Sequence, residues 1–174
     1  MAVPSSPSTE TFSPAASPLF LREDEVRRGV ELLYFGYTRL TRSVDELLVD
    51  HGFGRAHHRA LYFIARQPDL PVNALLKILS ITKQSLGRVL NDLSAKGLVE
   101  TRSGEQDRRQ KLLRLTGEGA AFEAQLFETL RVGLSAAYAA AGQEGVTGFW
   151  RVVEGLIPED EGQMVMKLQG RGRG

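Results

Sequence analysis

Residues 80–116, SITKQSLGRVLNDLSAKGLVETRSGEQDRRQKLLRLT, decide the fold. The first half of this stretch has an apolar and a polar stripe, each with the i, i+3, i+4, i+7 spacing of one helix face. The apolar stripe is Leu86, Val89, Leu90 and Leu93, and the polar stripe is Gln84, Gly87, Arg88 and Asn91. At 3.6 residues per turn the stripes lie nearly opposite each other, so one side of the helix packs and the other faces outward. The outward side is polar and hardly acidic, which suits an anionic groove.

The ends of this helix carry clear signals. Thr82 is a good N-cap residue, because its hydroxyl can bond an amide of the first turn. Lys96 and Gly97 predict the C-terminal end, with a cation in the last turn and a glycine available for a left-handed cap. After Gly97, residues 98–102 and 111–116 predict two strands, joined by a polar loop that holds a glycine. The stretch therefore predicts a helix followed by a two-stranded ribbon with a basic tip.

A second short helix is expected directly before this one. The segment Asp69–Pro71 predicts its start, because proline lacks the N–H that the first turn leaves unused and already has the required φ. Its apolar face ends at Leu79, so only Ser80 and Ile81 separate it from the N-cap Thr82. Two short helices joined this tightly predict a helix-turn-helix.

Further helices are expected on both sides of this region. Apolar residues at helical spacing predict helices at about 23–49 and 56–65 upstream, and at about 117–141 and 144–156 downstream. The long helices carry more apolar surface than the compact middle can cover, which favours packing against a second copy of the chain. A two-fold dimer is the commonest solution. The alternative is that these helices cover one another within a monomer.

Composition excludes several classes of protein. The 174 residues suit one domain of ordinary size, and 42% of hydrophobic residues are enough to build a core. No apolar run approaches the roughly 18 residues that span a membrane. The first residues also lack the basic segment followed by an apolar segment that is typical of a signal peptide. A cytoplasmic protein with no membrane partner is therefore expected. Cysteine is absent, which excludes disulfides, thiolate metal sites and thiol-based redox sensing.

Positive charge is concentrated in residues 80–116. The whole chain has a net charge of only +1, but residues 83–114 hold eight cations against four anions and leave −3 for the remainder. Such asymmetry is expected when one region meets phosphates, whose neutralisation supplies most of the sequence-independent affinity for nucleic acid. On charge alone, a solvated face explains the pattern equally well.

Three signatures resemble the MarR family of winged helix-turn-helix transcriptional regulators. They are VLNDL-x3-GLV at 89–99, DRR at 107–109 and LRLT at 113–116. The last two fit the family's DxRxxxLxLT wing pattern as Asp107, Arg109, Leu113, Leu115 and Thr116. Their order, their spacing and the flanking helices agree with the family from about Arg22 to Leu156, which is most of the chain.

The residues and the resemblance together predict a mainly α fold with a small β-hairpin wing. The expected parts are a flexible N-terminal arm at 1–20, a MarR-like domain at 21–158 and a flexible C-terminal tail at 159–174. Within the domain, a winged helix-turn-helix lobe at about 55–116 is flanked by N- and C-terminal dimerisation helices at about 23–50 and 117–157. The arm also follows from composition, because Ser, Pro, Thr and Ala bury too little apolar surface to offset the entropy of ordering.

The tip of the ribbon is expected to contact DNA. An arginine there can enter the minor groove, where a narrow width concentrates negative potential, but its long side chain must be held in place. Asp107 can pair with Arg109 or cap the turn through local backbone bonds. The resemblance implies that Arg109 or Arg108 approaches DNA while Asp107 orders the wing. The alternative is a solvated Asp–Arg pair worth under about 1 kcal/mol.

The helix at 82–96 is expected to read the DNA sequence. Its first turn presents free amides and a partial positive charge suited to a backbone phosphate. That turn consists of Thr82, Lys83, Gln84 and Ser85. Arg88 can bond a guanine in two places, and Gln84 or Asn91 an adenine likewise, each good pair being worth about 1 to 3 kcal/mol of discrimination. For each of these side chains the alternative is a contact to phosphate alone.

Gly87 lies in the middle of the reading face. Glycine removes a possible contact there and costs the helix about 1 kcal/mol relative to alanine. Close approach of the helix to DNA would offset that cost.

No catalytic site and no cofactor are expected. The only imidazoles are His51, His57 and His58. His57 and His58 point about 100° apart on a helix, so they cannot form the i, i+4 pair of a zinc helix. No glycine-rich phosphate loop, nucleophile elbow or HExxH motif occurs. The histidines are expected at the surface or in an interface, and a regulatory metal site such as zinc is left as an alternative.

The resemblance also implies a site for a small effector. Family members commonly bind small, often anionic aromatic compounds in a crevice between the dimerisation helices and the DNA-binding lobe, which weakens DNA binding. The candidates for lining such a crevice are Tyr34, Tyr37, His57, Arg59 and Tyr62. The alternative is that the aromatic residues among them are core or dimer contacts.

The chain is therefore expected to be a cytoplasmic homodimer that binds a pseudo-palindromic DNA duplex. Each protomer places a reading helix in a major groove and a wing at the adjacent minor groove. Repression is the default expectation, because most family members repress. The alternative is a winged-helix module that acts with another regulator, such as a response regulator. The segment YFGY at 34–37 resembles a MarR subgroup of purple bacteria whose genes lie beside the gene of a response regulator.

Overall fold

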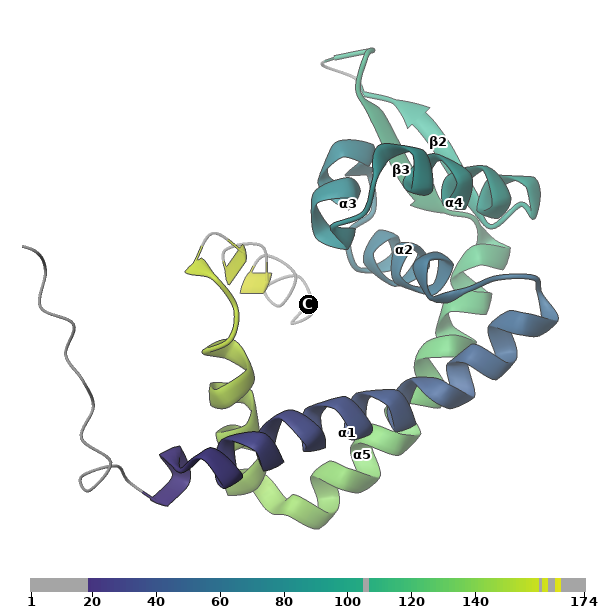
Figure 1. Cartoon of the computed structure of the whole chain (residues 1–174). Helices are drawn as coiled ribbons and strands as arrows, with labels where there is room; N and C mark the ends of the chain where they lie inside the picture. The colour runs from purple at the N-terminus through teal and green to yellow at the C-terminus, as the bar shows by residue number, and fades with distance from the viewer. Residues whose placement is uncertain (1–18, 105–106, 160, 163–164, 167–174) are drawn as a thin grey trace, which may run out of the picture. The chain divides into compact units, whose positions relative to one another are not determined.

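The computed structural model describes residues 19–104, 107–159, 161–162 and 165–166, and the chain divides into two compact units, 1–39 and 40–174. Along the chain (Figure 1) the elements are η2 (Leu19–Leu21), α1 (Glu23–Asp50), α2 (Arg55–Arg66), β1 (Leu70–Pro71), α3 (Val72–Leu79), α4 (Lys83–Ala95), β2 (Val99–Ser103), β3 (Lys111–Leu115) and α5 (Gly117–Glu154). Residues 1–18 of the expected arm lie outside the described residues.

The expected mainly helical fold with a small β wing is confirmed. The helices predicted at about 23–49, 56–65 and 82–96 are α1, α2 and α4, each within two residues of its expected ends. The two helices predicted after residue 116 are also present, because α5 is interrupted at Gly142, where φ is 70° and ψ is 172°. A positive φ suits glycine, which has no Cβ to clash.

One strand was not expected. Leu70–Pro71, interpreted from the sequence as the start of a helix, forms β1, which pairs antiparallel with β3 in the register Leu70↔Leu113. The sheet order is β1-β3-β2. The helix start was placed correctly, since α3 begins at Val72, but Pro71 is its N-cap with extended ψ of 140°. Proline fixes φ at about −65°, which both extended backbone and a helix start allow, and it favours an extended residue before it, so a short strand fits this position.

The expected flexible tail at 159–174 stays a prediction, but its described positions have helical backbone. Glu159, residues 161–162 and residues 165–166, the described positions after 158, are helical. Pro158 explains the local structure, because its carbonyl oxygen accepts hydrogen bonds from the N–H groups of Glu161, at 3.0 Å, and Gly162, at 2.9 Å. A proline at the beginning of a helical turn loses no hydrogen bond.

The core lies in the second unit, where α2 packs against α3, α4, α5 and β3. Every element from the C-terminal half of α1 to the start of α5 contributes buried aliphatic side chains. Six leucines of this core have no exposed surface: Leu48, Leu61, Leu75, Leu93, Leu113 and Leu126. Burying a leucine side chain stabilises a fold by about 1.5–3 kcal/mol, so this set fixes α4 and the wing onto one rigid support.

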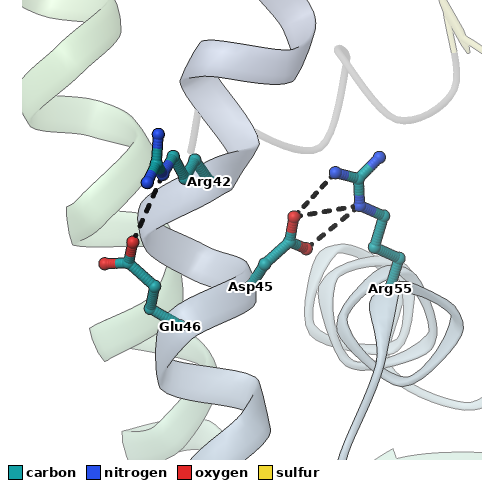
Figure 2. Close-up of polar contacts among 4 residues, drawn as sticks. All are labelled: Arg42, Asp45, Glu46 and Arg55. Carbon is teal, nitrogen blue, oxygen red and sulfur yellow. Dashed lines mark hydrogen bonds and ion pairs between the residues drawn. The ribbon is translucent and has the colours of Figure 1, made fainter.

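A carboxylate–guanidinium pair ties α1 to the first turn of α2 (Figure 2). Arg55 donates to Asp45 from Nε, at 3.0 and 3.1 Å, and from Nη2, at 2.6 Å. On the other side of α1, Arg42 and Glu46 lie one turn apart with an N–O distance of 3.5 Å. Both pairs are at least partly exposed, so each contributes under about 1 kcal/mol. The Asp45–Arg55 pair orients α2, whereas the Arg42–Glu46 pair lies within α1.

The first unit exposes its apolar side chains. All described side chains of residues 21–39 are exposed. The stripe that predicted a long helix is among them, with exposed fractions of 50% for Val26, 63% for Val30, 41% for Leu33 and 55% for Tyr37. Large apolar side chains in such a row are typical of surfaces that take part in protein–protein contacts.

Candidate nucleic-acid interface

The N-terminal end of α4 is capped as the sequence predicted. Thr82 has extended backbone, and its Oγ1 accepts a hydrogen bond from the N–H of Ser85 at 3.1 Å. The Oγ atoms of the two residues also lie 2.8 Å apart, within hydrogen-bond distance. Their hydroxyls therefore bond each other, while the remaining amides of the first turn point out of the helix end.

The C-terminal end of α4 matches its prediction too. Gly97 follows the helix with φ of 68°, and the N–H of Leu98 donates to the carbonyl oxygen of Leu93 at 2.9 Å. This six-to-one bond is the Schellman arrangement that a left-handed glycine allows. It turns the chain directly into β2, so the reading helix and the wing share one junction.

The two faces of α4 differ as expected. Leu86, Val89 and Leu93 are exposed by only 1%, 5% and 0%. The opposite face is exposed and carries Lys83, Gln84, Arg88 and Asn91. Within the described part of the chain, these four side chains make no hydrogen bond or ion pair. They are therefore free to bind a partner molecule.

The wing is a regular antiparallel ribbon that projects from the lobe of α2, α3 and α4 (Figure 1). β2 and β3 pair from Val99↔Leu115 to Ser103↔Lys111. The tip closes through Gly104, whose N–H donates to the carbonyl oxygen of Gln110 at 2.9 Å.

Asp107 makes one of the two interactions that the sequence allowed. Its Oδ1 accepts a hydrogen bond from the N–H of Arg109 at 2.9 Å, which is the local backbone bond and not an ion pair. The side chains of Arg108 and Arg109 are exposed. The bond therefore orders the backbone of the turn that carries both arginines at the outer end of the ribbon.

Replacing Asp107 by alanine should loosen this turn. Loss of one neutral-donor hydrogen bond costs about 1 kcal/mol, so the Arg109 amide should exchange with water about fivefold faster in NMR exchange measurements. Asp107→Asn keeps an acceptor oxygen and should preserve most of the protection. Equal exchange rates in the wild type and Asp107→Ala would show that the bond does not order the turn.

Among the described residues, two of the eight cations in 83–114 are paired with carboxylates. Arg102 lies 2.5 Å from Glu100, and Arg114 makes a bidentate pair with Asp69, including a 3.1 Å bond from Nε. The hydrogen bond from Arg114 lowers the pKa of Asp69 below its ordinary 3.8. Asp69 has left-handed backbone, with φ of 61°, and forms this pair from the turn before β1. This pair fixes β3 to the segment before α3, a contact that the sequence analysis missed.

His57 joins α2 to the reading helix. Its Nδ1 accepts a hydrogen bond from the N–H of Gly54 at 3.1 Å, so the neutral ring carries its proton on Nε2, 3.1 Å from Oδ2 of Asp92. The side chain is only 15% exposed, and its ring stacks on Phe53. His57 is therefore not at the free surface, because the helix start and a ring stack hold it, and an interface position stays a prediction.

His58 was expected at the surface or in an interface, and in the described chain it is half-buried. Its Nε2 is buried without a hydrogen-bond partner among the described residues. Burial lowers the pKa of His58 below its ordinary 6.5, against the charge of Asp45, which raises it. A neutral imidazole is the form that this site tolerates.

This burial should make the fold sensitive to acid. The unfolded chain binds a proton at His58 more readily than the folded one, so the free energy of unfolding should fall as pH decreases below about 6.5. Urea titrations at pH 7.5 and 5.5 measure the change. His58→Leu, of similar volume and without a titrating group, should lose less stability over this interval. An equal loss in both proteins would show that protonation of His58 is not the cause of the acid sensitivity.

The proposed effector residues fall in both units. Tyr34 and Tyr37 of the first unit are 66% and 55% exposed. Tyr62 of the second unit packs its ring against Phe63 and Phe127, with centroid distances of 5.3 and 6.3 Å. Arg59 is exposed, whereas His57 is held by the bonds described above. The contacts of Tyr62 fit the alternative that it is a packing residue, and a common effector site stays a prediction.

The described residues contain neither a metal-binding cluster nor a membrane-spanning helix. No group of three or more His, Asp or Glu side chains is placed to hold a metal ion. None of the described helices combines the length and the apolar character needed to cross a membrane.

Comparisons with known proteins identify the family. Residues 51–110 match the sequence model of the MarR family. The HTH-type transcriptional regulator PetP of Rhodobacter capsulatus is 47% identical over 139 residues, covering 80% of this chain and 84% of the relative.

Solved structures share the fold. A mutant of MarR from E. coli, complexed with operator DNA, has a TM-score of 0.61 at 24% identity and covers 82% of this chain and 100% of its own. NadR in complex with 4-hydroxyphenylacetate has a TM-score of 0.64 at 22% identity, and the match covers 85% of this chain and 97% of the NadR chain.

Proposed function

The chain belongs to the MarR family, and on this premise we propose that this transcriptional regulator is a cytoplasmic homodimer that binds a pseudo-palindromic DNA duplex. Each protomer places α4 in a major groove and its β2–β3 wing at the adjacent minor groove. The observation that carries the proposal is the exposed face of α4, where Lys83, Gln84, Arg88 and Asn91 lie opposite a buried apolar stripe. Polar side chains without partners on a rigidly packed helix are what sequence readout requires.

The contacts of α4 divide into two kinds. The first turn, Thr82 to Ser85, binds a backbone phosphate through its amides and Lys83, because the helix end carries a partial positive charge. Arg88 reads a guanine through O6 and N7, and Gln84 or Asn91 reads an adenine. Phosphate contacts position the helix, and base contacts specify the sequence.

The wing supplies a further, less selective contact. Arg108 and Arg109 stand at the tip of a ribbon whose turn is held by Asp107. A guanidinium that enters the minor groove is attracted by the negative potential there, which depends on groove width more than on base identity. The wing therefore adds affinity for any duplex and a preference for narrow grooves.

The exposed apolar side chains of each unit support the dimer. The first unit exposes the α1 stripe, and the end of the second unit exposes Phe149, Trp150, Val152 and Leu156 by 43% to 65%. A second copy of the chain covers such surfaces in a two-fold arrangement, which also matches the symmetry of a pseudo-palindromic site.

We further infer repression relieved by a small aromatic or anionic effector. NadR was crystallised with 4-hydroxyphenylacetate, an aromatic anion. Arg59 offers a cation, and Tyr34, Tyr37 and Tyr62 offer aromatic rings, with His57 as a further candidate. Such a ligand acts by favouring a dimer geometry in which the two reading helices no longer fit the duplex.

Selection from a random-sequence duplex library tests the proposed function. The wild-type protein should enrich duplexes with an inverted repeat, and the enriched duplex should shift in a gel with an affinity that falls steeply with salt. Light scattering should give the mass of a dimer. No enrichment at low ionic strength would reject DNA reading. Capture of another regulator without any shift of DNA would favour the interaction-module alternative.

A further inference from the structure

Gly87 stands at an open position on the reading face of α4. It lies one turn from Lys83, Gln84 and Asn91, whose side chains are exposed. A Cβ added at Gly87 would meet no atom within 4 Å. The position therefore has open space in front of the helix backbone, and exposed polar side chains lie one turn away on either side.

The fold itself gives no reason for glycine here. Gly97 is required by its φ of 68°, and Gly119 by the carbonyl oxygen of Leu98, which a Cβ would approach to 1.9 Å. Gly87 has neither constraint, since its φ is helical and its surroundings are empty. Glycine inside a helix is less stable than alanine, because it loses more backbone entropy on folding. The remaining explanation for glycine at position 87 is a partner molecule that comes close to the helix backbone.

We propose that Gly87 is a specificity-determining residue, at which the backbone of α4 contacts a base-pair edge that carries a thymine methyl group. This inference rests on the proposed function, because it needs α4 in the major groove. The bare Cα offers a small apolar surface. Gln84 and Asn91 beside it present amides that match the N7 and N6 of adenine, and the thymine of such a pair places its methyl group in the same groove.

The first test compares stability with DNA affinity. Gly87→Ala should raise the midpoint of thermal unfolding by roughly 2–4 °C, because alanine favours the helix. The same variant should bind the duplex selected by the wild-type protein about tenfold more weakly, because the new methyl group overpacks the contact. Gly117→Ala, at another open glycine in the first turn of α5, is the control and should leave DNA affinity unchanged.

The second test removes a methyl group from the DNA to compensate for the one that Gly87→Ala adds to the protein. Each thymine of the selected duplex is replaced in turn by deoxyuridine, which lacks only the 5-methyl group. At one position in each half-site, this replacement should restore the affinity of Gly87→Ala to within about twofold of the wild type on the same duplex. At the other thymines it should change both proteins equally.

The outcomes separate the two proposals. If the wild type selects no duplex, the proposed function fails and the inference fails with it. If the wild type selects a duplex that Gly87→Ala binds equally well, the inference alone is overturned. A loss of affinity that deoxyuridine restores at none of the positions also overturns it, because the contact is then not to a thymine methyl group.

Discussion

Replacing Gly119 by alanine is expected to lower the free energy of unfolding by about 3 kcal/mol. A Cβ at this position would lie 1.9 Å from the carbonyl oxygen of Leu98 and 2.8 Å from its carbonyl carbon. Leu98 cannot move freely, because the same oxygen accepts a hydrogen bond from the N–H of Thr116 at 3.1 Å. The substitution should therefore disturb the point where α4, the wing and α5 meet.

The matched control is Gly117→Ala in the same helical turn. A Cβ at Gly117 would meet no atom within 4 Å, so the free energy of unfolding should change by less than about 1 kcal/mol. Urea unfolding followed by circular dichroism measures both variants. A loss in Gly119→Ala no larger than that in Gly117→Ala would show that the junction yields more easily than its backbone bonds indicate.

The second large effect is expected at Arg88. Arg88→Ala should weaken binding to the selected duplex by about 1 to 3 kcal/mol and relax the preference at one base pair in each half-site. Arg109→Ala should weaken binding to all duplexes alike and reduce the salt dependence, because a minor-groove contact carries little sequence information. The two arginines thus differ in the kind of loss more than in its size.

Repeated selection with each variant distinguishes these two roles. Arg151→Ala removes an exposed cation from α5 and controls for net charge alone; its affinity and preference should match the wild type. If Arg88→Ala enriched the same sequence as the wild type, Arg88 would be a phosphate contact and the base-reading assignment would be wrong.

Local patterns in the sequence predicted most of the helices. The spacing of Leu86, Val89 and Leu93 located α4, and its caps at Thr82 and Gly97 are those that residue type alone indicated. Such features depend on residues within one or two turns of each other. The break at Gly142 was visible for the same reason.

Contacts between distant residues were missed. β1 has two residues, too few for a pattern, and its pairing with β3 depends on the tertiary fold. Asp69 and Arg114 are 45 positions apart, and His57 and Asp92 are 35 apart. No local rule relates such pairs, so the sequence predicted which residues face outward but not which of the cations are paired.

The central claim is that two α4 helices and two wings contact one duplex, and hydroxyl-radical footprinting on the selected duplex tests it most directly. The account predicts two protected regions related by a two-fold axis, with their centres about 10 base pairs apart or a multiple of that spacing. Protection should extend into the minor groove beside each region, and Arg109→Ala should remove only that flanking part. A single unsymmetric footprint, or flanking protection unchanged in Arg109→Ala, would contradict the account.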